Sequence, residues 1–197
     1  IYFTYTHLHS YPKFSEVGLP DKLNQYLKKK TNKQDQIRSY LAYCLLNKTL
    51  AEFTDESLDS LAFSNYGKPF LSDSSWEFSL SHSHNLIGLA LSDQGKIGLD
   101  IQYKQQKAPD FSQLQGMPEM LVDSTPARFF DYWTLAESCA KADGRGVAGS
   151  QFCKIKVLDE HQLRDENYLW FYKKIHLYED FSIHLCCISP IINLIHL

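Results

Sequence analysis

The sequence lacks long apolar runs. No stretch approaches the ~20 uninterrupted apolar residues that a membrane-spanning helix needs. Its first ten residues, IYFTYTHLHS, have neither the basic head nor the apolar centre of a secretory signal peptide. We therefore expect a soluble protein of the cytoplasm that does not bind membranes.

Cysteine is scarce, and its spacing is not that of a zinc or redox site. The chain has five cysteines, an odd number, and they form no CxxC pair. They are interpreted as buried thiols of a reducing compartment. The histidines of the SHSH stretch, His82 and His84, are accompanied by no Cys or Glu pattern that completes a tetrahedral set, so zinc is disfavoured.

Positive charge is not in excess over the whole chain. The formal net charge of −3 argues against a general nucleic-acid-binding protein. Residues 13–48, however, hold eight Lys or Arg against three acidic residues, a local balance of +5. This asymmetry indicates an anion site in the first quarter of the chain, although a solvated helix face explains the lysine run at 28–30 equally well.

The order of the elements predicts an α+β protein. Helical spacing marks three segments, at 19–29, 32–50 and 125–146, with Asn32 near the start of the second and Gly144 as the stop of the third. Strand-like patterns mark 1–9, 75–83, 86–92, 96–102, 151–158, 167–178 and 181–188, with a hairpin at 93–95.

The two halves share one outline, in which helices are followed by antiparallel strands. This predicts two similar lobes, each an antiparallel sheet packed with a long helix, related by a pseudo-twofold axis. We expect an N-terminal lobe at 1–95, a C-terminal lobe at 96–197 and, within it, a polar connection at 102–126.

Asp100 is the most informative single residue. It lies in the apolar, strand-like run KIGLDIQY, where an ionised carboxylate needs a partner. Glu137 and Lys141 are four residues apart and share one face of the long helix. A surface salt bridge between them is the ordinary explanation. Together with Asp100, however, Glu137 suggests a pair of carboxylates from a strand and a helix, an arrangement that suits Mg²⁺.

Four motifs stand in a recognisable series: YGKPFL at 66–71, FSLSHSHNLIGLAL at 78–91, IGLDIQ at 97–102 and FFDYWTLAESCAKADGRG at 129–146. The series resembles the 4′-phosphopantetheinyl transferases, specifically the longer, two-lobed kind named after the surfactin synthetase activator. The resemblance implies a holo-acyl-carrier-protein synthase. Such an enzyme transfers the 4′-phosphopantetheine group from coenzyme A to a serine of an acyl or peptidyl carrier protein, releases adenosine 3′,5′-bisphosphate, and serves fatty-acid or secondary-metabolite synthesis.

The resemblance also implies roles for individual residues. The metal ligands would be Asp100, Glu137 and Gln102, the last standing where many relatives have a second acid. The catalytic residues would be Asp100, Glu137, Lys141 and His82. Coenzyme A would be contacted by Lys22, Arg38, Lys68, Ser81, His82 and Lys141. Glu137, a metal-bound water or His82 would be the general base, and these three stay open.

Partners and alternatives follow from the same series. The carrier protein is expected at the 102–126 connection, where five apolar residues would either receive it or fill the cleft between the lobes: Phe111, Leu114, Met117, Met120 and Leu121. Two fused lobes favour a monomer. A non-catalytic coenzyme A or carrier-protein binder, altered at Gln102 and at Ala136, where a lysine is common, is the second hypothesis. Another Mg²⁺-dependent, phosphate-cleaving enzyme is the third.

Overall fold

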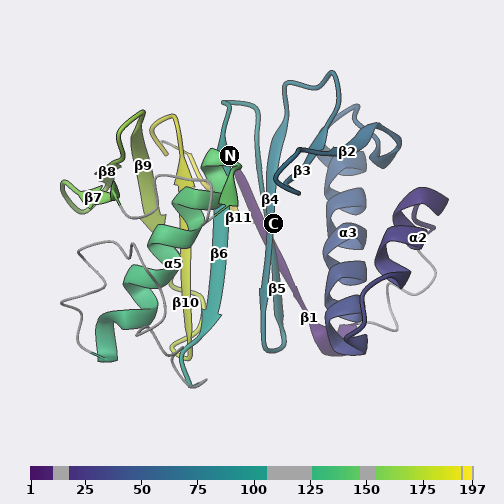
Figure 1. Ribbon diagram of the computed structural model, residues 1–197, viewed down its shortest axis with the longest axis horizontal. Coiled ribbons are helices and arrows are strands. Elements are labelled where there is room, and N and C mark those ends of the chain that lie inside the picture. The colour runs from purple at the N-terminus through teal and green to yellow at the C-terminus, as the bar shows by residue number, and fades with distance from the viewer. Residues whose placement is uncertain (11–17, 106–125, 147–153, 192, 197) are drawn as a thin grey trace.

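The computed structural model describes residues 1–10, 18–105, 126–146, 154–191 and 193–196 (Figure 1). Within this part the chain is α+β and has two lobes, each with a sheet and a long helix, as predicted. Among the described helices, none combines the length and the apolar content that crossing a membrane requires.

The first lobe is built on a four-stranded sheet of order β11-β1-β5-β4. These strands are β1 (Tyr2–His7), β4 (Glu77–Ser83), β5 (Leu86–Ser92) and β11 (Ile195–His196). The helices beside the sheet are α2 (Asp21–Lys28) and α3 (Lys33–Phe53), on the right in Figure 1. A small two-stranded sheet, β2 (Leu61–Phe63) with β3 (Pro69–Leu71), carries the loop that contains Gly67 and Lys68.

The second lobe is built on a five-stranded sheet of order β6-β10-β9-β8-β7. Its strands are β6 (Ile97–Tyr103), β7 (Lys156–Val157), β8 (Gln162–Arg164), β9 (Leu169–Lys174) and β10 (Phe181–Cys187). The long helix α5 (Pro126–Asp143) crosses β10 and β6 (Figure 1).

Local sequence signals account for the helix ends. The side chain of Asn32 accepts hydrogen bonds from the backbone N–H groups of Gln34 and Asp35, so it caps α3 as predicted. Gly144, with φ of +89°, ends α5, and its N–H donates to the carbonyl oxygen of Ala140.

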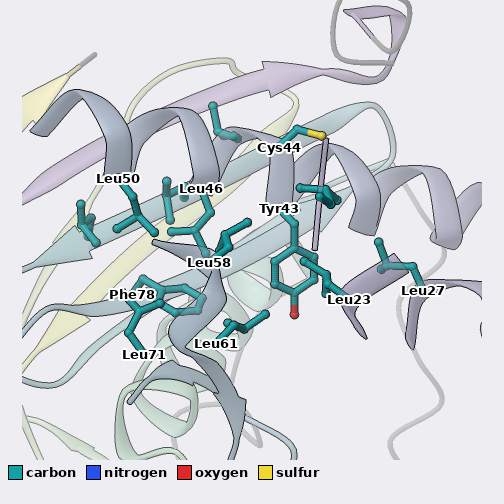
Figure 2. Close-up of a cluster of buried hydrophobic side chains, with 14 residues drawn as sticks. Leu23, Leu27, Tyr43, Cys44, Leu46, Leu50, Leu58, Leu61, Leu71 and Phe78 are labelled. Atoms are coloured by element: carbon teal, nitrogen blue, oxygen red, sulfur yellow. The ribbon is translucent and has the colours of Figure 1, made fainter. Parts of the chain in front are cut away.

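The first-lobe core gathers leucines and aromatic residues from α2, α3, the small sheet and β4. Figure 2 shows Leu46 and Leu50 of α3 above Phe78 of β4 and Leu71 of β3, all buried. Burial of this apolar surface is the main stabilising contribution to the lobe. Because α3 and β4 pack against each other in this core, the polar residues that the same helix and strand carry outside the core are held at fixed positions relative to one another.

Most of the predicted elements are confirmed, but of the strand predicted at 151–158 only Lys156–Val157 is a strand, and residues 151–153 lie outside the described part. The short strands β2, β3, β8 and β11 were not predicted, and β11 pairs in parallel with β1, so the chain end returns to the first lobe's sheet. The predicted division into lobes at 1–95 and 96–197 therefore stays a prediction. The strand β11 lies in the second of these ranges but pairs with a strand of the first. Most of the 102–126 connection, with the apolar residues from Phe111 to Leu121, lies outside the described residues.

The two lobes meet where β4 faces β6, near the centre of Figure 1. Three serines of β4 make the junction, since Ser79, Ser81 and Ser83 accept hydrogen bonds of 2.9, 3.1 and 2.9 Å from backbone N–H groups of β6. The donors are Leu99, Ile101 and Tyr103. Side-chain hydroxyls thus satisfy one edge of the second sheet, where a neighbouring backbone would otherwise be needed.

Candidate active site

Asp100 lies at this junction and is 3% exposed. Its Oδ1 atom accepts hydrogen bonds from Ser81 Oγ of β4, at 3.0 Å, and from Lys141 Nζ of α5, at 2.7 Å. Its Oδ2 atom is buried and has no hydrogen-bond partner among the described residues. The carboxylate therefore has a cation at one oxygen, while its other oxygen is buried without a partner among the described residues.

Lys141 reaches Asp100 because α5 packs directly on β6. At Gly98 the two backbones approach so closely that a Cβ atom would lie 1.9 Å from the carbonyl oxygen of Ser138. The lysine also donates to Ser81 Oγ at 3.0 Å. A surface pair of Lys141 with Glu137, the ordinary explanation of their spacing, is wrong as a description of this contact, because the ion pair joins the helix to a buried strand residue.

Glu137 is half-buried beside this pair. Burial and, next, the negative charge of Asp100 together raise the pKa of Glu137 to about 7, although Lys141 opposes the increase. The two predicted carboxylates thus lie close enough to repel each other, as two groups that share a cation would. Their role as joint ligands of a metal stays a prediction.

A cleft of about 240 Å³ opens next to Lys141. It is lined by residues 66–69 of the loop between β2 and β3, by 78–80 of β4, and by Lys141, Gly144 and Gly146. Lys68 lies inside it, 3.4 Å from Glu77 Oε2, and burial lowers the pKa of Lys68 although Glu77 opposes this. Lys68 and Lys141, from different lobes, thus line one cleft.

His82 lies on β4 next to Ser81 and is surrounded by positively charged side chains. Burial, followed by the charges of Lys141, Arg38 and Lys30, lowers the pKa of His82 to about 4, so the ring is neutral at pH 7. Arg38 is fixed nearby, since its Nε donates to the carbonyl oxygen of His84 at 2.9 Å and its Nη1 pairs with Asp35 at 2.8 Å. Such a concentration of cations favours an anionic ligand.

Two of the residues predicted to contact coenzyme A, Lys22 and Ser81, do not have a free polar group directed into this cleft. Lys22 lines a separate groove between α2 and the small sheet, with Tyr26, Leu61 and Phe63. The hydroxyl of Ser81 donates to Asp100 and accepts from Lys141 and from Ile101 N–H, so its hydrogen is already used. Their roles toward coenzyme A stay predictions.

The donor set fits a small, hard cation. It comprises the partnerless Asp100 Oδ2, the neighbouring Glu137, and Gln102, which follows Asp100 by two residues and therefore shares its face of β6. No cluster of three or more His, Cys, Asp or Glu side chains suited to a metal occurs among the described residues. Two carboxylates and an amide oxygen leave positions for water and phosphate, which is the coordination that Mg²⁺ prefers.

Sequence reasoning missed a buried polar network that fixes α5 one turn before Glu137. Thr134 Oγ1 lies 2.7 Å from His184 Nδ1 and 2.9 Å from Ser182 Oγ, and Ser182 donates to Asp131. His184 is paired in the strand register with Asp100. Burial lowers the pKa of His184 to about 3, so it is neutral. Its position in a run of apolar strand residues was the available signal.

Lys30, Ser79 and Ser83 were also missed. Lys30 belongs to the lysine run that a solvated helix face explained equally well, yet its charge acts on His82. The serines repeat every second residue in SLSHS, which places them on one face of a strand. That period was the signal for the lobe junction.

Comparison with known proteins agrees with this arrangement. No family model matches the chain. The chain is 30% identical over 125 residues to the 4′-phosphopantetheinyl transferase gsp of Aneurinibacillus migulanus, covering 59% of this chain and 52% of that protein. It is 30% identical over 102 residues to the 4′-phosphopantetheinyl transferase HetI of Nostoc sp., covering 44% of this chain and 42% of that protein. The chain thus matches about half the length of these curated relatives. The two-lobed fold and the buried Asp100 beside Glu137 agree with this similarity to two 4′-phosphopantetheinyl transferases.

Proposed function

We propose that the chain transfers the 4′-phosphopantetheine group of coenzyme A to a serine hydroxyl of an acyl or peptidyl carrier protein, with Mg²⁺, and releases adenosine 3′,5′-bisphosphate. The observation that supports this best is the junction at Asp100. There, one carboxylate oxygen is held by Lys141 and Ser81, while the buried second oxygen has no partner in the described part of the chain.

The cations around the cleft support coenzyme A as the donor. Coenzyme A carries a pyrophosphate and a 3′-phosphate, and both need positive partners. Lys68 and Lys141 line the cleft, whereas Arg38 and Lys30 act on His82 just beyond β4. We assign the pyrophosphate to Lys68 and Lys141, and the 3′-phosphate to the group around His82.

Asp100, Glu137 and Gln102 are the residues that would hold Mg²⁺. When bound, the cation would neutralise charge that develops on the departing bisphosphate. Ser81 acts here as a positioning residue, because its hydroxyl fixes Oδ1 of Asp100 and leaves Oδ2 directed elsewhere.

Glu137 is the proposed general base. A carboxylate whose pKa is raised to about 7 by burial and by Asp100 is matched to accept the proton of the carrier serine near neutral pH. His82, with its pKa lowered to about 4 by burial and nearby cations, is the weaker base of the two.

The remaining assignments complete the proposal. The acceptor docks at the 102–126 connection, and the enzyme acts as a cytoplasmic monomer without nucleic acid or membrane partners. The pathway, whether fatty-acid or secondary-metabolite synthesis, follows from the carrier that it modifies.

Mass spectrometry tests the transfer directly. The protein is incubated with coenzyme A, Mg²⁺ and a panel of apo carrier proteins, and modification adds about 340 Da to the carrier. Glu137→Gln should abolish the gain. Glu160→Gln, at a side chain that is 87% exposed on the β7–β8 turn, is the matched control and should leave it unchanged. Equal product from Glu137→Gln would remove Glu137 from the base role.

A second candidate is a non-catalytic or weakly active homologue that binds coenzyme A or a carrier protein. Gln102 favours it, since this amide replaces the second acid that the family resemblance leads us to expect. Ala136 also favours it, because a lysine is common at this position. In this chain the position is fully buried in the core between α5 and its sheet, so it offers no charge to a phosphate. Binding of coenzyme A with no carrier product at high Mg²⁺ would support this candidate. Release of adenosine 3′,5′-bisphosphate without carrier would instead indicate a phosphate-cleaving enzyme.

A further inference from the structure

The ion pair between Lys141 and Asp100 is asymmetric in its surroundings. The Asp100 side chain is 4% exposed, whereas the Lys141 side chain is 32% exposed. A buried carboxylate needs a countercharge, because removing it from water is costly. Lys141 supplies that countercharge at 2.7 Å. The carboxylate is fixed in the junction, and its cation is at the edge of solvent.

Lys141 also lines the cleft in which the proposed coenzyme phosphates would lie. Two of the three N–H donors of its ammonium group are used by Asp100 and Ser81. One donor is left, so a phosphate in the cleft that takes more than one hydrogen bond from this ammonium group competes with Asp100 for it. A long, flexible side chain such as lysine changes partners at low cost.

Asp100 binds the ammonium group of Lys141 and a divalent cation less strongly when both are present than when only one is. A divalent cation at Oδ2 would lie beside a carboxylate whose other oxygen already holds the positive charge of Lys141, and like charges repel. Displacement of the lysine toward a phosphate would remove this repulsion.

We propose that Lys141 is an exchangeable counter-ion: it neutralises Asp100 while the cleft lacks an anion, and the coenzyme phosphates draw it away, which couples binding of the divalent cation to binding of coenzyme A. This inference rests on the proposed function for the identity of the two ligands. Linkage requires the coupling to be reciprocal, so the cation strengthens coenzyme binding by the same factor.

Binding of Mn²⁺, measured by electron paramagnetic resonance of the free ion, tests the inference without any transfer reaction. For the wild-type chain we expect saturating coenzyme A to tighten Mn²⁺ binding about tenfold or more. In Lys141→Met, which keeps the length of the side chain and removes its charge, Mn²⁺ should bind about fivefold or more tightly than in the wild type without coenzyme A. The further gain from coenzyme A should then be smaller. Direct contact of the cation with phosphate, by itself, predicts no tightening in the free variant.

Two controls isolate the ion pair. Lys68→Met removes another lysine of the same cleft, one that contacts Glu77 and the carbonyl oxygen of Ile97. It should change Mn²⁺ affinity in the absence of coenzyme A less than about twofold, because the hydrogen bonds of Lys68 go to Glu77 and Ile97 and leave the pair of Asp100 and Lys141 intact. Lys141→Arg keeps the positive charge and should therefore not show the tighter Mn²⁺ binding expected of Lys141→Met in the absence of coenzyme A. Circular dichroism of each variant confirms that it is folded.

The inference is overturned if Lys141→Met binds Mn²⁺ no more tightly than the wild type without coenzyme A, or if Lys68→Met tightens it equally. Its failure is distinguishable from failure of the transferase proposal. A protein that couples Mn²⁺ to coenzyme A but never modifies a carrier contradicts only the transferase. A protein that modifies carriers while Lys141→Met leaves Mn²⁺ affinity unchanged contradicts only the counter-ion.

Discussion

Gly98 of β6 lies directly against the backbone of Ser138 in α5: a Cβ atom at this glycine would be 1.9 Å from the Ser138 carbonyl oxygen and 2.4 Å from the Ala142 nitrogen. Backbone atoms cannot turn aside as a side chain does. The contact therefore fixes the height of α5 above β6, and with it the distance from Lys141 to Asp100.

Gly98→Ala should accordingly affect both stability and activity. Overpacking of this kind costs about 1–3 kcal/mol in the free energy of unfolding. A shift of the helix by about 1 Å would lower the transfer rate about a hundredfold. Urea denaturation and the carrier-modification assay measure the two effects. Gly18→Ala is the control, because a Cβ there meets no atom within 4 Å; similar values for both variants would contradict the assigned role of Gly98.

Ser79→Ala should weaken the lobe junction. The change removes the acceptor for the buried Leu99 N–H, and an unsatisfied buried donor costs about 1–3 kcal/mol. Ser83→Ala should cost less, because Tyr103 is half-buried and water can replace the hydroxyl. Denaturation of these variants beside the exposed Ser75→Ala gives the comparison. A loss at Ser79 no larger than at Ser75 would show that the junction does not depend on this bond.

Glu137 predicts a pH dependence of stability. Its pKa is about 7 in the folded protein, raised from 4.5 by burial and by Asp100, so the folded state binds more protons than the unfolded state between these values. The free energy of unfolding should therefore fall as pH rises from about 4.5 to about 7, by up to about 3 kcal/mol.

The amide of Glu137→Gln does not titrate, and this variant should lack that part of the slope. Both proteins are unfolded in urea at a series of pH values, with chelator present to remove divalent cations. Parallel curves for the two proteins would mean that Glu137 does not carry the raised pKa.

His82→Gln should raise the KM for coenzyme A about tenfold or more and leave kcat within about twofold, since a charge-assisted hydrogen bond to phosphate contributes about 1.5–3 kcal/mol. His82 has its pKa lowered to about 4 and is neutral in the free protein, and a phosphate beside it would raise that value. Coenzyme binding near pH 6 should thus take up protons.

Calorimetry in buffers of different ionisation enthalpy measures this uptake, which should decrease in His82→Gln. Tyr103, whose ring stacks on that of His84 at 4.5 Å, offers the control variant Tyr103→Phe, which keeps the stack. A change in kcat alone for His82→Gln would instead point to a role in proton transfer.

The parts of the fold that follow local rules were predictable from sequence. Asn32 capped a helix, Gly144 ended one, and the alternation in β4 and the apolar run of β5 indicated strands. Short strands such as β3 and β8 carry too few residues to show a period, and the pairing of β11 with β1 joins residues at opposite ends of the sequence. Only tertiary contacts decide these.

The site was predictable in its residue types more than in its contacts. An aspartate in an apolar strand required a partner, and Lys141 is the partner that the structure provides, although spacing alone paired that lysine with Glu137. Lys22 and Lys30 belong to the same basic segment, yet only Lys30 acts on His82, while Lys22 lines another groove. Charge density along a sequence does not say toward which side of a helix each cation points.

The serine contacts between β4 and β6 have a consequence for how this molecule tolerates genetic change. Ordinary strand pairing uses peptide groups that every residue except proline possesses, so it survives most substitutions. Here three particular hydroxyl groups help to set the relative placement of the two halves, together with the apolar core that the two sheets share. Ser→Thr and Ser→Cys exchanges at Ser79 and Ser83 therefore offer a way to adjust the spacing of the halves while Ser81, which also contacts Asp100 and Lys141, is left unchanged.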